Sequence, residues 1–144
     1  MLRQLAVGFT VSFLNIMIHA VVMTAVARAG RLAGANRTAR PSVFLIIVMI
    51  ATAAILMVAH TSEAFVWALA YAVVGAAPAG TNLMYFAFVN YTTLGYGDVT
   101  HVSRWQLLGP MTAMNGMLLF GWSTAVIFEV LRRAMVRVNM VGDF

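Results

Sequence analysis

The stretch that decides the fold reads Thr81-Asn82-Leu83-Met84-Tyr85-Phe86-Ala87-Phe88-Val89-Asn90-Tyr91-Thr92-Thr93-Leu94-Gly95-Tyr96-Gly97-Asp98. Its first part is an aromatic-rich run of about ten residues, long enough for a short helix but too short to cross a membrane. Its second part cannot easily continue that helix, because glycines flank Tyr96 and glycine adopts backbone conformations that other residues resist. Non-helical backbone at membrane depth leaves carbonyl groups unpaired unless they line a polar pathway. We therefore expect a short re-entrant helix and a loop whose carbonyl groups can bind a dehydrated cation.

The composition of the whole chain indicates a membrane protein. Of the 144 residues, 62% are hydrophobic and only 9% are charged, whereas a soluble domain has about half apolar and about a quarter charged residues. The nine basic residues are all arginine, give a formal net charge of +5, and lie at the ends of apolar runs, as at membrane borders. A nucleic-acid partner is not expected, because that would need basic residues gathered on one exposed face.

The same composition argues against an enzyme. The absence of cysteine excludes disulfides, thiol catalysis and cysteine-ligated metals. The three histidines, His19, His60 and His101, are scattered, and no set of nucleophile, base and acid is apparent. We expect no catalytic residues and no cofactor.

An additional N-terminal transmembrane helix is predicted over residues 1–29. The apolar run 5–27 would be about 34 Å long as a helix, enough to cross a hydrocarbon core of about 30 Å. A cleaved signal peptide is the rival interpretation, because Ala25-Val26-Ala27 resembles a cleavage site. We reject it because the run is long, Asn15 and His19 interrupt it, and cleavage would leave the arginines that follow on the outer side. Residues 30–41 then form a basic linker, which the positive-inside rule places in the cytoplasm.

A second apolar helix begins at Ser42, just after Pro41, and is interrupted at residues 60–63 before a further apolar run that ends at Pro78. The 42–77 segment would be about 54 Å long if straight, too long for one simple crossing. Either the helix projects beyond the outer leaflet, or it breaks near Thr61 and a second helix lies at the interface. The third crossing is expected from residue 105 to about 128, followed by a short cytoplasmic tail over residues 134–144. With both arginine-rich ends inside, the N-terminus lies outside and the C-terminus lies in the cytoplasm.

The segment Thr92-Thr93-Leu94-Gly95-Tyr96-Gly97-Asp98 resembles the selectivity filter of potassium channels, whose usual core is Thr-Val-Gly-Tyr-Gly. A short helix before it and a crossing on each side are similar to the outer helix, pore helix and inner helix of that family. The third crossing adds a similar spacing of residues, namely Gly116, Phe120, Gly121, Thr124 and Ala125. The resemblance covers residues 42–133, a potassium channel pore domain, and leaves the first helix as an addition.

The resemblance implies that backbone carbonyl groups replace the hydration shell of a permeant potassium ion. These would belong to Thr93, Leu94, Gly95 and Tyr96, with the Thr93 hydroxyl, in a filter that runs to Gly97. Because one chain carries one filter and four surround an ion, a homotetramer follows. Leu94 departs from the commoner valine and is not β-branched, which leaves a non-selective monovalent cation channel open as an alternative. A second alternative is a non-conducting membrane scaffold.

The same resemblance implies roles for further residues. Asp98 at the outer mouth would bond to Tyr85 of the pore helix, with water as the alternative partner of this carboxylate, while Thr92 supports the filter. Gly116 is the expected hinge of the inner helix, and Gly121 a position of close helix packing. Thr124 and Asn115 are candidates to face the central cavity, although for Asn115 a hydrogen bond between helices is at least as good an interpretation.

Three polar residues inside apolar runs are candidate pH sensors. Asn15 and His19 share one face of the first helix, and polar groups there should face a neighbouring helix or water. His60 and Glu63 are three residues apart and could pair on one face near the outer boundary. The default interpretations are a structural contact for His19 and anchoring at the interface for His60 and Glu63, with pH sensing as the alternative.

The sequence thus predicts an all-α integral membrane protein with three transmembrane helices, a re-entrant pore helix and a tetrameric pore. It would reside in the cell membrane as a multi-pass protein. Its partners would be membrane lipid, potassium ions and further copies of the chain.

Overall fold

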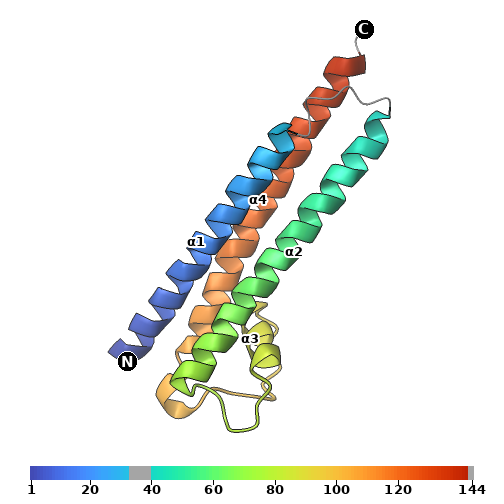
Figure 1. The fold of residues 1–144 in the computed structure, drawn as a ribbon. Helices are drawn as coiled ribbons and strands as arrows, with labels where there is room; N and C mark the ends of the chain where they lie inside the picture. Colours follow the sequence, from blue (N-terminus) through green and yellow to red (C-terminus); the bar gives the residue numbers. More distant parts are fainter. Residues whose placement is uncertain (33–39, 143–144) are drawn as a thin grey trace.

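The computed structural model describes residues 1–32 and 40–142, which form four α-helices and one short 3-10 helix (Figure 1). The elements are α1 (Leu2–Leu32), α2 (Pro41–Val74), α3 (Leu83–Tyr91), η2 (Ser103–Trp105) and α4 (Leu108–Gly142). Three segments are long and apolar enough to cross a membrane, Leu2–Ala29, Ser42–Val74 and Ser103–Val136. The predicted all-α membrane fold, with three spanning helices and one short helix, is confirmed.

The three long helices lie side by side, and α3 packs against α2 and α4 at one end of the bundle (Figure 1). The N-terminus of α1 lies at this same end, where the side chain of Gln4 accepts a hydrogen bond of 2.8 Å from the backbone N–H of Leu107. The C-terminal ends of α1 and α4 lie at the opposite end. Residues 33–39 of the predicted basic linker, including Arg37, fall outside the described residues, as do residues 143–144.

The second crossing is one unbroken helix, about 51 Å long for its 34 residues. The alternative with a break near Thr61 is therefore wrong, for a local reason. The hydroxyl groups of Thr61 and Ser62 donate to carbonyl oxygens of their own helix, those of Met57 and Ala59. Polar residues that satisfy themselves in this way do not interrupt the helix.

The third crossing is shifted relative to the prediction. Trp105 belongs to η2, and α4 begins only at Leu108. At its other end α4 runs on to Gly142, so residues 134–142 of the predicted tail are helical. The carboxylate of Glu129 accepts hydrogen bonds from Arg132 and Arg133, one turn further on. These exposed pairs have helical spacing and are compatible with a helix that continues through them.

The core lies where α2, α3 and α4 meet, around large side chains with almost no exposed surface. These are Trp67, Tyr71, Phe86, Tyr91, Leu108 and Leu119. Because two of them come from α3, the short helix is held by the same core as the long helices. The loop that follows α3 therefore starts from a fixed point.

Candidate functional site

The short helix α3 is positioned by hydrogen bonds at both of its ends. At its start, the Asn82 side chain accepts a hydrogen bond of 3.1 Å from the backbone N–H of Tyr85, as an N-cap does. At its end, the Thr92 hydroxyl donates to the carbonyl of Phe88 at 2.7 Å. The predicted pore helix is thus a nine-residue helix, and residues 92–98, the predicted filter and called the filter segment below, follow directly.

The filter segment has an unusual backbone, with positive φ at Thr93 (61°), Gly95 (56°) and Gly97 (77°). A positive φ costs a non-glycine residue about 1–2 kcal/mol, so the backbone at Thr93 is strained. The N–H of Thr93 donates to the carbonyl of Asn90, and the N–H groups of Leu94 and Gly95 both donate to that of Val89. The first half of the segment is therefore held against the end of α3.

The carbonyl groups of the same segment have no such partners. Within the described part of the chain, no hydrogen bond is accepted by the carbonyl oxygens of Thr93, Leu94, Gly95 or Tyr96. Residues 92–98 are also all exposed in the single subunit. Unpaired carbonyl oxygens in an accessible loop are suitable ligands for a hard cation.

The expected contact between Tyr85 and Asp98 is present. The Tyr85 hydroxyl donates a hydrogen bond of 2.7 Å to the carboxylate of Asp98. This bond raises the pKa of Tyr85 above its ordinary value, because loss of the phenolic proton would bring two negative charges together. The contact ties the residue that follows the filter to the first turn of α3.

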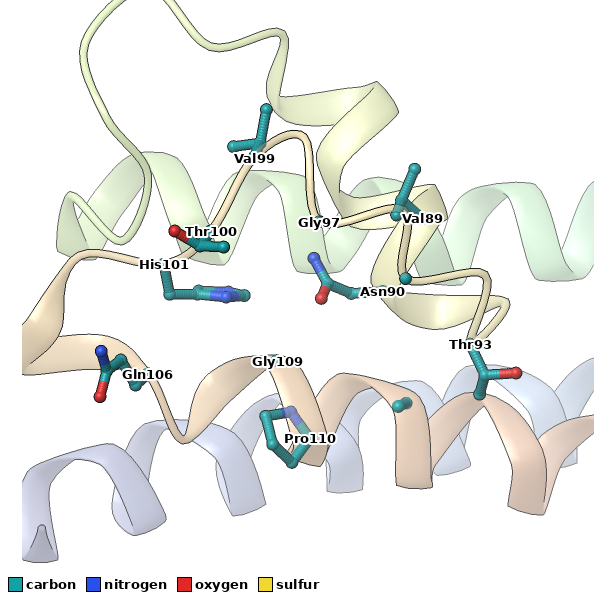
Figure 2. A pocket seen from close by; sticks show the side chains of 12 residues that line it. Val89, Asn90, Thr93, Gly97, Val99, Thr100, His101, Gln106, Gly109 and Pro110 are labelled. Carbon is teal, nitrogen blue, oxygen red and sulfur yellow. The ribbon is translucent and has the colours of Figure 1, made fainter.

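A cavity of about 470 Å³ lies between the filter segment and the start of α4 (Figure 2). Figure 2 shows the ring of His101 and the amide of Asn90 on the filter side of this space, with Gly109 and Pro110 of α4 opposite. His101 is packed between Tyr71 and Phe86, with ring centroids 4.8 and 4.5 Å away. Burial lowers the pKa of His101 to about 4, so the imidazole is neutral at physiological pH.

Gly116 and Gly121 of α4 differ in their surroundings. A Cβ atom at Gly116 would lie 1.9 Å from the carbonyl oxygen of Tyr91, whereas one at Gly121 would have nothing within 4 Å in the subunit. Within the subunit it is Gly116 that lets α4 touch the end of α3, and close helix packing at Gly121 stays a prediction. Because α4 runs unbroken through Gly116, bending at this hinge stays a prediction.

Asn115 does not face the predicted cavity. Only 1% of its surface is exposed, and its side-chain oxygen accepts hydrogen bonds from Asn15 at 3.1 Å and Trp67 at 3.0 Å. The alternative interpretation, a hydrogen bond between helices, is the one found. Thr124 lies on an exposed face, where its hydroxyl donates to the carbonyl of Phe120, so its place in a central cavity stays a prediction.

The three candidate pH sensors lie together inside the bundle. Nδ1 of His19 is 2.8 Å from one carboxylate oxygen of Glu63, and Nδ1 of His60 is 2.9 Å from the other. His19 and Glu63 are fully buried, so the expected anchoring of Glu63 at the membrane interface is wrong. The three side chains offer ligand atoms within 4.8 Å of one another. The nitrogen–oxygen contacts, however, have the lengths of hydrogen bonds.

Sequence reasoning missed two members of this group, Tyr91 and Ser123. The Tyr91 hydroxyl donates to Glu63, and the Ser123 hydroxyl is 2.9 Å from Nε2 of His60. The sequence did contain a signal. Polar residues spaced four apart in α1 and three apart in α2 require partners within a membrane, but their spacing does not identify those partners.

Comparisons with known proteins give one finding. A family model described as an ion channel matches residues 42–133, nearly two thirds of the chain. The matched range includes α3, the filter segment and most of α2 and α4. The comparisons with curated proteins and with solved structures give no match.

Proposed function

The chain belongs to this ion channel family, and from that premise we propose that it forms a potassium-selective channel in which four copies surround one pore. Ions would pass down their electrochemical gradient without coupling to another reaction. The pore would be lined by Thr93, Leu94, Gly95 and Tyr96, whose carbonyl groups replace the water around a potassium ion. No resident cofactor is needed for this activity.

The observation that carries the proposal is the row of unpaired carbonyl groups. Four successive residues offer carbonyl oxygens without partners in the described structure, directly after a helix that fixes where they begin. At membrane depth such groups need a polar partner, because lipid supplies none. A permeant cation would be such a partner. An ordinary tight turn, by contrast, would not explain the strained backbone at Thr93 together with positive φ at Gly95 and Gly97.

The proposed tetramer is supported by side chains that the single subunit leaves uncovered. Leu94 is 53% exposed and Tyr96 is 67% exposed, although both are large and apolar and lie in the filter segment. One chain also supplies only one filter strand, and several strands must surround an ion for their carbonyl groups to replace its water. Neighbouring copies would cover these side chains and complete the ring.

The arginines support a proposed orientation in the membrane. Arg28 near the end of α1 and Arg132 and Arg133 in α4 belong to the end of the bundle opposite the filter (Figure 1). The positive-inside rule places that end in the cytoplasm and the filter at the outer face of the cell membrane. The N-terminus would then be outside.

The selectivity is tested by reconstituting the full chain in liposomes with opposed potassium and sodium gradients. We expect a reversal potential that follows the potassium gradient, together with block by barium. A reversal potential that tracks sodium equally would replace the proposal with a non-selective cation channel, the function that unbranched Leu94 favours. Absence of flux from correctly assembled protein would support a non-conducting scaffold instead.

The contact between Tyr85 and Asp98 supports a further expectation about the filter. In the variant Tyr85→Phe the ring remains and only the hydrogen bond to Asp98 is lost. We expect potassium current to decay severalfold faster during sustained opening, since the residue after the filter is released. Single-channel recordings measure this decay, and Thr10→Ala, which removes an exposed hydroxyl group of α1 outside the filter segment, is the control. Unchanged decay in Tyr85→Phe would contradict the bracing role.

A further inference from the structure

A buried polar cluster joins all four α-helices on the inner side of the filter. It consists of His19 from α1, His60 and Glu63 from α2, Tyr91 from α3 and Ser123 from α4. Tyr91 is the last residue of α3, so the cluster contacts the helix end that holds the filter segment. The proposed conduction makes no use of these five side chains.

Glu63 lies inside the segment Ser42–Val74 that can span a membrane, and its side chain has no exposed surface. A carboxylate at that place is costly unless a positive charge and hydrogen bonds compensate it. The carboxylate of Glu63 has three hydrogen-bonding partners, His19 at 2.8 Å, His60 at 2.9 Å and the Tyr91 hydroxyl at 2.5 Å. Nδ1 of His60 is also 2.9 Å from the Tyr91 oxygen. When Glu63 is ionised and accepts from both rings, Nδ1 of each histidine carries a hydrogen atom.

The opposite nitrogen atoms of the two rings converge on one hydroxyl group. Nε2 of His60 is 2.9 Å from the Ser123 oxygen, and Nε2 of His19 is 3.4 Å from the same oxygen. A hydroxyl group donates one hydrogen only. Two neutral imidazoles would therefore leave one Nε2 lone pair facing the serine oxygen without a hydrogen between them.

One additional proton resolves the arrangement. If one ring carries hydrogen on both nitrogens, its Nε2 donates to Ser123, and Ser123 donates to the other ring. Every polar atom in the contact then has a partner, and the imidazolium balances the charge of Glu63. The rings of Trp122 and Phe120, 5.3 and 4.5 Å from His19 and His60, complete the surroundings on the α4 side.

We propose that His19, His60, Glu63, Tyr91 and Ser123 form a proton-binding site in which the two histidines share one exchangeable proton, and that its occupancy regulates conduction. The regulatory part rests on the proposed channel function, while the binding of the proton does not. The titratable groups that face the shared proton are His19 from α1, His60 and Glu63 from α2, and Tyr91 from α3. From α4 the hydroxyl of Ser123 faces it.

The distances favour a proton over a metal ion. Two ligands of a tetrahedral zinc ion are about 3.4 Å apart, whereas the nitrogen–oxygen contacts here are 2.8 and 2.9 Å. A divalent ion with one carboxylate would also leave a net positive charge inside the bundle. The proton makes the cluster neutral.

The direction of the pH effect follows from this charge balance. The proton is bound at low pH, and its contribution to stability is lost as the pH rises through the titration of the site. Loss leaves Glu63 uncompensated and removes one of the two hydrogen bonds that join His19 of α1 and His60 of α2 to Ser123 of α4. We expect potassium flux to fall as the pH rises, because the support behind the filter is weakened.

The site is tested in the full chain in lipid bilayers, with the histidine side chains labelled by ¹⁵N and observed by solid-state NMR from about pH 5 to 9. At low pH we expect one imidazolium per subunit, lost in a single step on raising the pH. The third histidine and the tyrosine of the cluster do not titrate in this range. His101 has a pKa of about 4, and burial raises the pKa of Tyr91 above its ordinary value.

Three variants sharpen the test. Glu63→Gln removes the charge that the imidazolium balances, so the imidazolium signal and the pH step of the flux should both disappear. Ser123→Ala, a smaller change that should leave the fold intact, removes the acceptor of the imidazolium and should weaken the imidazolium signal at low pH. Thr61→Ala removes an exposed hydroxyl group of the same helix and should leave both readouts unchanged.

Several outcomes would overturn the inference. Two neutral histidines throughout the pH range, in wild type and Ser123→Ala alike, would refute the proton site. Stoichiometric zinc binding that abolishes the pH step and is lost in Glu63→Gln would make the cluster a metal site. An NMR step with flux that does not vary with pH would refute the regulatory part, whereas absence of flux at every pH would refute the proposed function and leave the NMR result standing.

Discussion

Replacing Gly116 by alanine should abolish potassium flux and lower the stability of the subunit. A Cβ atom there would lie 1.9 Å from the carbonyl oxygen of Tyr91 and 3.0 Å from its carbonyl carbon. Both are backbone atoms, so the clash cannot be relieved by rotating a side chain, and α4 and the end of α3 must separate. Overpacking of this kind costs about 1–3 kcal/mol, more than the roughly 1 kcal/mol that alanine gains over glycine in a helix.

The matched control is Gly121→Ala, five residues further along the same helix. With nothing within 4 Å of the added Cβ in the subunit, this variant should gain helix propensity and unfold at the same or a higher temperature. Thermal unfolding in detergent and potassium flux in liposomes measure the two effects. Equal stability and equal flux in both variants would refute a contact between α4 and the filter support at Gly116.

The second large effect is expected at Gly95. Alanine there must adopt a φ near 56°, at a cost of about 1–2 kcal/mol, or turn the peptide groups whose carbonyl oxygens are proposed to bind potassium. We expect the variant to assemble but to lose at least nine tenths of the potassium flux. Flux through proteoliposomes, normalised to the assembled protein, is the measurement.

Gly80→Ala is the control that separates the free-energy cost of a positive φ at alanine from an effect on the filter. Gly80 also has a positive φ, of 81°, and open space around an added Cβ, but it lies before α3 in a connecting loop. The two variants should lose similar stability, while only Gly95→Ala loses conduction. Retention of selective flux in Gly95→Ala would argue against the proposed ion-binding carbonyl groups.

The parts of the site that sequence reasoning reached are those that depend on local spacing. The contact of Tyr85 with Asp98 follows from the resemblance of one short segment, and His60 and Glu63 pair because they are three residues apart on one helix. The short helix before the filter was also predicted, since its aromatic run ends where the glycines begin. Such features require no knowledge of how the long helices pack.

The parts that sequence reasoning missed depend on the register between helices. Glu63 pairs with His19, 44 positions away, and Asn115 pairs with Asn15. Close backbone contacts, such as that of Gly116 with Tyr91, determine which residues of neighbouring helices face one another. Such contacts cannot be predicted from the composition. The alternative with a break in α2 was wrong because Thr61 and Ser62 bond to carbonyl groups of their own helix, while Glu63 has partners within the bundle.

The bond between Asn15 and Asn115 also has a consequence for biosynthesis. Asn115 is made 100 residues after Asn15, an interval of about 5–20 s at ordinary rates of translation. During this time the amide of Asn15 can donate to the backbone carbonyl of Glu63 in α2, at 3.1 Å, which avoids the cost of an unpaired amide in lipid. The helix α1 therefore obtains a first polar partner when α2 is made, and its second partner only when α4 follows.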